Sequence, residues 1–165
     1  MTHLLEHVGI GRQSLYDTFG GKRALFLECL SHYFRERMGP AMAQLRGPGS
    51  PLGNIREVFK MWDKMAQESS FCGCMVGNAT AELGHNDPEV AEVLAGCYRA
   101  IEDAFTDALT RAQELGEISS EQDPRGVAQV LVNTIQGVAL LSKVLKDRNL
   151  ARNVIQASFS LVERA

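Results

Sequence analysis

Apolar residues recur three and four positions apart along most of this chain, and that spacing constrains its fold more than any other feature. An α-helix turns once every 3.6 residues, so apolar side chains at this spacing gather on one face. The longest such stripe is formed by Val90, Leu94, Cys97, Ile101, Phe105, Leu109 and Ala112. No segment alternates β-branched and polar residues as a half-buried strand would. The sequence therefore predicts an all-α fold.

Proline and glycine residues mark where these helices begin and end. Three dipeptides place a capping side chain directly before a proline, which favours a helix start: Ser50-Pro51, Asp87-Pro88 and Asp123-Pro124. Glycines at 9, 84 and 116 stand where helices are expected to stop. The predicted helices cover residues 2–8, 12–18, 22–45, 51–68, 73–83, 88–115, 124–146 and 149–164. The segment "RGPGSPLGN" (46–54) is interpreted as a hinge.

Composition is that of a globular protein: 165 residues, 45% apolar and 22% charged, with a formal net charge of −3. Residues 1–60 hold eight Lys and Arg against five Asp and Glu, which gives this segment a charge of about +3. A mildly basic head on an acidic body fits a local nucleic-acid contact, although chance asymmetry explains it as well. We find no secretion signal and no apolar run long enough for a membrane. A cytoplasmic protein with four reduced cysteines is expected.

Residues 2–19 have the pattern of two short helices joined by a glycine-containing turn, which is typical of a helix-turn-helix. The second helix of such a motif enters the major groove, and its outer face needs short polar and cationic side chains. The candidates for that face are Arg12, Gln13, Ser14 and Thr18. Tyr16 and Lys22 are placed to contact phosphates. By spacing alone, a small helical protein without DNA-binding activity could show the same pattern.

The stretch "GIGRQSLYDTFGGKRALFLECL" closely resembles the head motif of the tetracycline-repressor (TetR) family of bacterial regulators. The matching positions are Gly9, Tyr16, Phe19, Lys22, Ala24 and Leu25. The resemblance implies a small helix-turn-helix head with its connecting helix at residues 1–46. It also implies a larger helical domain at 47–165 that binds an effector and forms dimers.

Two departures from the family pattern concern the head. Gly11 stands where such proteins usually have a small hydroxyl residue, so the cap of the second helix is expected to be weak. The family's first helix is absent, which is expected to leave five apolar side chains partly uncovered: Leu4, Leu5, Val8, Leu15 and Phe19. Either the start was assigned too late, or the chain is a short form with a degraded head. We favour the first interpretation.

The body is predicted to hold an effector pocket lined by large apolar or amphipathic side chains. The candidates are Trp62, Met65, Phe71, Met75 and Tyr98, with Asn78 as a polar group. Each of them could instead be an ordinary core residue. No metal is expected at "FCGCMVG", because Cys72 and Cys74 have only His85 nearby in the sequence, and no cofactor is expected.

The segment "GCMVGNATAELGHNDPEV" resembles a branch of the family in which the Gly-Cys cysteine is sometimes an electrophile or redox sensor. That role carries over to Cys74 alone, which we therefore also count among the effector-binding candidates. Sensing requires an exposed thiolate of low pKa, whereas a buried thiol would only pack.

The last two helices are interpreted as a homodimer interface because they carry small and branched residues that permit close packing. The candidates are Val130, Thr134, Gly137, Val138, Val154, Ala157 and Leu161. The alternative is that these helices only complete a monomeric core. A dimer would present two heads to the halves of a palindromic operator.

These observations predict a one-component transcriptional regulator, acting as a repressor, which a small-molecule effector releases from double-stranded DNA. The alternative is a head-truncated protein that binds an effector or dimerises but no longer binds DNA. An enzyme is not expected, since no Gly-rich phosphate loop, G-x-S-x-G, H-E-x-x-H or EF-hand motif occurs. The identity of the effector, the operator sequence and the regulated genes do not follow from the sequence.

Overall fold

The computed structural model describes residues 2–68, 71–145, 147 and 149–164, except for the side chains at 161, 163 and 164. This part of the chain contains eight helices and no strand, so the all-α prediction is confirmed. The helices are α1 (Thr2–Val8), α2 (Arg12–Phe19), α3 (Lys22–Leu45), α4 (Pro51–Ala66), α5 (Met75–Leu83), α6 (Pro88–Glu114), α7 (Pro124–Leu141) and α8 (Leu150–Arg164). Within the described ranges, none of them is long and apolar enough to cross a membrane.

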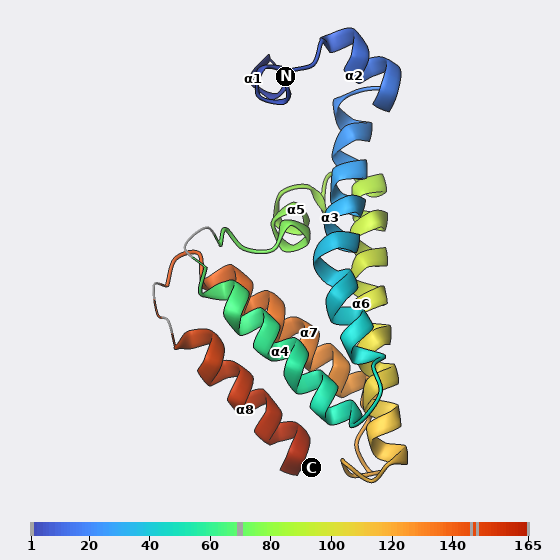
Figure 1. Ribbon diagram of the computed structural model, residues 1–165, viewed down its shortest axis with the longest axis vertical. Helices are drawn as coiled ribbons and strands as arrows, with labels where there is room; N and C mark the ends of the chain where they lie inside the picture. The colour runs from blue at the N-terminus through green and yellow to red at the C-terminus, as the bar shows by residue number, and fades with distance from the viewer. Residues whose placement is uncertain (1, 69–70, 146, 148, 165) are drawn as a thin grey trace.

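Two long helices, α3 and α6, run side by side and form the spine of the molecule (Figure 1). The short helix α2 continues from the upper end of α3, and α1 stands apart from the other helices beyond it. At the opposite end, α4, α7 and α8 form a diagonal group beside the spine, and α5 fills the space between the group and α3. The head is therefore joined to the body through α3.

The predicted capping residues make the expected hydrogen bonds. The Ser50 Oγ accepts from the Gly53 amide at 2.8 Å, and Asp87 and Asp123 accept from amides in the first turns of α6 and α7. The predicted end of the seventh helix is wrong, because α7 stops at Leu141 and not at 146. Beyond it, Val144 and Leu145 are exposed, so no core beneath them favours another turn.

The apolar stripe of α6 lies at the centre of two hydrophobic clusters. All seven of its predicted members are buried. The larger cluster joins the second half of α6 to α4, α7, α8 and the C-terminal part of α3, through residues such as Phe59, Phe105 and Leu131. The smaller cluster joins the first half of α6 to α5 and to Leu30 of α3. Because α3 contributes to both clusters, its movement is tied to the packing of the body.

The segment 46–54, predicted as a hinge, is held by several hydrogen bonds. Asn54 is buried, and its amide donates to the Gly47 carbonyl at 2.9 Å while its carbonyl accepts from Gln44 at 3.0 Å. The Leu52 amide donates to the carboxylate of Glu117 at 2.8 Å. These hydrogen bonds satisfy the turn internally and connect it to the turn that follows α6. The buried Asn54 supplies hydrogen bonds that the turn's backbone lacks, and movement of the head about this segment stays a prediction.

The head has a small core on one side and a bare helix on the other. None of the residues of α1 is buried, and Leu4 and Val8 are exposed, in agreement with the expected loss of cover. The expectation was wrong for Leu15, which is only 1% exposed on a helix that contacts α3. Leu5 and Phe19 are half-buried. The core beneath α2 is therefore formed without α1.

Candidate functional site

The outward face of α2 collects the polar side chains that were predicted to read DNA. Leu15 and the half-buried Phe19 fix the inner face of this helix. The six predicted residues, all of them exposed, are Arg12, Gln13, Ser14, Tyr16, Thr18 and Lys22. A helix with an apolar inner face packed on the protein and a polar, exposed outer face has the form that major-groove recognition requires.

Hydrogen bonds within α2 limit how its polar residues can act. The Gln13 amide donates to the Asp17 carboxylate at 2.7 Å, which orients Gln13 along the helix and leaves its carbonyl oxygen free to accept. Gly11 occupies the N-cap position and supplies no side-chain cap, as expected. At the other end, Gly20 adopts a left-handed conformation with φ of 78°, and its amide donates to the Tyr16 carbonyl at 2.8 Å.

Arg23 joins the first turn of α3 to the beginning of α6. Its guanidinium donates to both carboxylate oxygens of Asp87, with Nε 3.0 Å from Oδ2, and to the carboxylate of Glu89. The guanidinium beside Asp87 and the Val90 amide hold the pKa of that carboxyl below its ordinary value. This bridge lies where the head meets the body, so it fixes the end of α3 that carries α2.

The predicted effector residues do not line one cavity. Trp62 and Met65 face a hollow of about 360 Å³ between α3 and α4. Trp62 and Phe71 also border a closed space of about 10 Å³ under α7 and α8. Met75 and Asn78 line a third hollow of about 370 Å³ between α3 and α5, together with Phe26 and Tyr33. The sequence identified side chains of the right type without showing that they belong to separate hollows.

Cys74 and Tyr98 are packed among the helices. Cys74 is buried at the start of α5, and the Gln136 amide of α7 lies 3.9 Å from its sulfur. Tyr33 of α3 lies near the same thiol. Burial of the Tyr33 hydroxyl, together with the nearby Cys74, raises the pKa of Tyr33. The Tyr98 hydroxyl lies 3.2 Å from Thr80 Oγ1. The thiol of Cys74 thus sits at a junction of α3, α5 and α7.

The exposed face of α7 is only partly the one predicted for the dimer. Val130 is 52% exposed, and an added Cβ at Gly137 would meet no other atom within 4 Å. Thr134 and Val138 instead line the closed space beneath α8. On α8, Ala157 is exposed and Val154 is half-buried, while the side chain of Leu161 lies outside the described residues. Leu140 and Leu141, which were not predicted, are exposed and continue the face of Val130 and Gly137.

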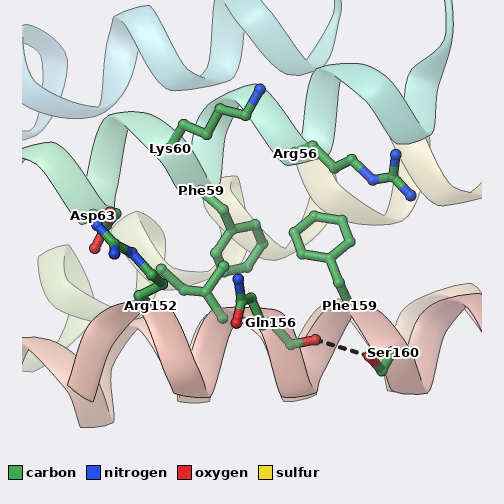
Figure 2. A pocket seen from close by; sticks show the side chains of 9 residues that line it. Arg56, Phe59, Lys60, Asp63, Arg152, Gln156, Phe159 and Ser160 are labelled. Atoms are coloured by element: carbon green, nitrogen blue, oxygen red, sulfur yellow. Dashed lines mark hydrogen bonds between the residues drawn. The ribbon is translucent and has the colours of Figure 1, made fainter. Parts of the chain in front are cut away.

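The sequence reasoning also missed a groove between α4 and α8. Its volume is about 600 Å³, and Figure 2 shows it lined by aromatic and charged side chains of both helices. The spacing Arg56, Lys60, Asp63 on one face of α4 was the available signal. No set of three His, Cys, Asp or Glu side chains in the described part of the chain is arranged to hold a metal ion.

Comparison with known proteins agrees with this architecture. Residues 51–158 match the family described as "Tetracyclin repressor-like, C-terminal domain". An uncharacterised HTH-type transcriptional regulator of Bacillus subtilis, YezE, is 32% identical over 162 residues, which cover 97% of this chain and 84% of that protein. The Escherichia coli HTH-type transcriptional repressor BdcR is 27% identical over 113 residues, covering 67% of this chain and 55% of that protein.

Solved structures show the same fold. The reduced form of Escherichia coli NemR superposes with a TM-score of 0.88 at 18% identity, covering 97% of this chain and 84% of that one. A cysteine mutant of the TetR-family regulator CifR, complexed with operator DNA, superposes with a TM-score of 0.85 at 23% identity, covering 97% and 85%.

The helix-turn-helix head, the connecting helix and the helical body together define an HTH-type transcriptional regulator. The chain belongs to the tetracycline-repressor family.

Proposed function

We propose that this protein is a dimeric repressor that binds a palindromic operator through α2 and leaves it when a small effector occupies the body. The observation that carries the proposal is the exposed polar face of α2, held in place by the buried Leu15. Relatives support it, since BdcR is named a repressor and CifR is solved with operator DNA.

The chemistry of α2 divides its residues between reading and positioning. Arg12, Gln13 and Ser14 lie in the first turn, the part of a recognition helix that contacts base edges. Tyr16 and Lys22 follow, and Lys22 begins α3, where free backbone N–H groups also attract a phosphate. Asp17 lies on the same face, and its carboxylate accepts the hydrogen bond of the Gln13 amide.

The hollow between α3 and α5 is the proposed effector site. It is lined by Phe26, Tyr33 and Met75, with the Asn78 amide as a polar contact, and its volume of about 370 Å³ suits a small ligand. The Lys143 ammonium donates to the Asn78 carbonyl at 2.9 Å and links this site to the end of α7. A ligand here touches α3 directly, which the hollow under α7 and α8 would not provide.

Occupancy of this site changes the head through α3. The Arg23 bridge to Asp87 and Glu89 fixes the head end of α3 against α6, so a ligand that pushes on Phe26 and Tyr33 works against that bridge. Two heads held at one spacing favour DNA, and another spacing favours the effector. Each ligand then weakens the binding of the other by the same factor.

Selection from random duplexes tests the DNA-binding proposal. We expect the protein to enrich an inverted repeat whose half-sites lie about one helical turn apart, because a two-fold dimer presents two α2 helices. Enrichment of no sequence at low salt would favour the second candidate, a protein that binds an effector or dimerises without binding DNA. The observation that favours this second candidate is that no residue of α1 is buried.

A substitution that fills the α3–α5 hollow tests the effector site separately. Met75→Trp places an indole in the α3–α5 hollow and should mimic the ligand, lowering operator affinity while the dimer persists. The matched control is Met61→Trp, which alters the exposed Met61 in the α3–α4 hollow and should leave the affinity unchanged. If both substitutions changed operator affinity equally, the effector site would not be the α3–α5 hollow.

A further inference from the structure

The hollow between α3 and α5 has two walls of different chemistry. Phe26 and Tyr33 of α3 supply two aromatic rings, and they stand seven positions apart, on one face of that helix. The other wall comes from α5, whose Met75, Asn78 and Glu82 recur at spacings of three and four. The two helices contact each other (Figure 1). A molecule in this hollow therefore meets aromatic rings, a thioether, an amide and a carboxylate.

The lining of the hollow carries charge of one sign. Glu82 is the only Asp, Glu, Lys, Arg or His residue among the lining residues. Within the described part of the chain, its carboxylate has no hydrogen bond or ion pair. The Tyr33 hydroxyl is neutral near neutral pH, because its burial and the neighbouring Cys74 raise the pKa of Tyr33. The lining therefore favours a cation over an anion.

Lys143 is a cation beside this hollow, and it sits toward the N-terminal end of α5. Its ammonium donates to the Asn78 carbonyl at 2.9 Å, and a Cβ added at Gly73 would lie 3.0 Å from its Cδ. Glu82 lies four residues beyond Asn78, which is about 6 Å further along the helix axis. Lys143 makes no ion pair with Glu82 in the part of the chain that the structure describes. The C-terminal end of the α5 wall is therefore left to the carboxylate.

The place of Glu82 on α5 is unfavourable for the helix by itself. The C-terminal end of a helix carries a partial negative charge from its unpaired carbonyl groups, so an acidic side chain in the last turn is repelled. α5 ends at Leu83, one residue beyond Glu82, and its last turn holds no basic residue. A bound cation beside Glu82 would interact favourably with both the carboxylate and the helix end.

We propose that the α3–α5 hollow takes an aromatic ammonium compound, with its charged group beside Glu82 and its ring against Phe26 and Tyr33. This inference names the chemical class of the effector, and it rests on the function proposed for this hollow. Aromatic rings pack well against one another, and the Met75 thioether is a polarizable contact for a ring. The volume of about 370 Å³ suits one small molecule of this kind.

Calorimetric titration of the whole protein, without DNA, tests the charge preference. At neutral pH phenethylamine is a cation, phenethyl alcohol is neutral and phenylacetate is an anion, and the three have one ring and similar size. We expect phenethylamine to bind about tenfold more tightly than the alcohol, and phenylacetate to bind more weakly than both. A phenethylamine affinity no higher than that of either analogue, or no binding at millimolar concentration, would overturn the proposal.

Substitutions assign the binding to this hollow. Glu82→Gln should reduce the affinity for phenethylamine to about that for the alcohol, and Met75→Trp, which fills the hollow, should abolish binding. The control Glu92→Gln removes the same charge from an exposed position of α6 outside the lining and should have no effect. Thermal unfolding without ligand identifies any variant that has lost its fold. A folded Glu82→Gln protein that binds phenethylamine as the wild type does would contradict the assignment.

Operator binding in the presence of phenethylamine separates this inference from the effector proposal. If phenethylamine binds with the expected dependence on Glu82 and operator affinity is unchanged, the cation site is supported and its regulatory role is wrong. If Met75→Trp lowers operator affinity and phenethylamine does not bind, the effector site is supported and the chemical class is wrong.

Discussion

The four cysteine residues differ in how far solvent reaches their thiols. Cys29 and Cys72 are exposed, whereas Cys74 and Cys97 are buried, and burial raises the pKa of Cys97. Because the thiolate is the reactive form, we expect a thiol reagent to modify Cys29 and Cys72 in the native protein well before the other two. Mass spectrometry of peptides after brief alkylation measures this order. Rapid modification of Cys74 would contradict the closed packing and favour the sensor role.

Asp87 gives the head a dependence on pH. Its pKa is lowered chiefly by Arg23 in the folded protein, so the stability that the bridge contributes is present above the ordinary carboxyl pKa. That contribution is lost as the pH falls through the lowered folded value. Arg23→Gln should raise the pKa of Asp87 toward its ordinary value, and the Val90 amide should keep it from returning fully. Carboxyl carbon chemical shifts followed by NMR measure both values, and an unchanged Asp87 pKa would show that the bridge is not formed.

The role of a residue could be predicted from the sequence where only its near neighbours in the chain determine that role. The polar face of α2 and the caps at Ser50, Asp87 and Asp123 are set by neighbours within four positions. The Arg23 bridge could not be predicted, because it joins residues 64 and 66 positions apart. The aromatic α4–α8 groove depends in the same way on two helices that only the fold brings together.

Two glycines within or beside helices are expected to respond in opposite ways to alanine. Gly20 ends α2 with φ of 78°, so Gly20→Ala should destabilise the head by about 1 kcal/mol. Gly96 lies within α6 with open space around its would-be Cβ, so Gly96→Ala should stabilise the protein by about 0.5–1 kcal/mol. Chemical denaturation of both variants measures the difference. A Gly20→Ala protein at least as stable as the wild type would contradict the backbone conformation described for Gly20.

The boundaries of two long helices were predicted closely. α3, with residues 22–45, was predicted with its boundaries, and α6 differed by one residue at its end. The end of α7 was misplaced because the apolar spacing continues through Val144 and Leu145 although no partner helix covers them. Periodicity shows that residues share a face, and it does not show whether another element packs against that face.

At the scale of the whole molecule, the exposed face of α7 is the proposed contact between two copies. Gly137→Ala should stabilise an isolated helix, because alanine is the better helix former. In a close-packed dimer the added methyl group would meet the partner's α7 and weaken association, so the two expectations differ in sign. Sedimentation velocity over a range of protein concentrations should show a more dissociated Gly137→Ala protein, with Gly96→Ala as the control. Association equal to that of the control would place the interface on another face.

Binding of the selected duplex, followed by fluorescence anisotropy over a series of salt concentrations, tests the central claim that α2 reads DNA. Lys22→Gln should weaken all duplexes alike and reduce the salt slope by about one. Gln13→Ala should cost about 1–3 kcal/mol on the selected duplex and relax its preference over a scrambled one, with the slope unchanged. If Gln13→Ala retains the full preference and Lys22→Gln retains the full slope, the DNA contact lies elsewhere and the account of α2 is contradicted.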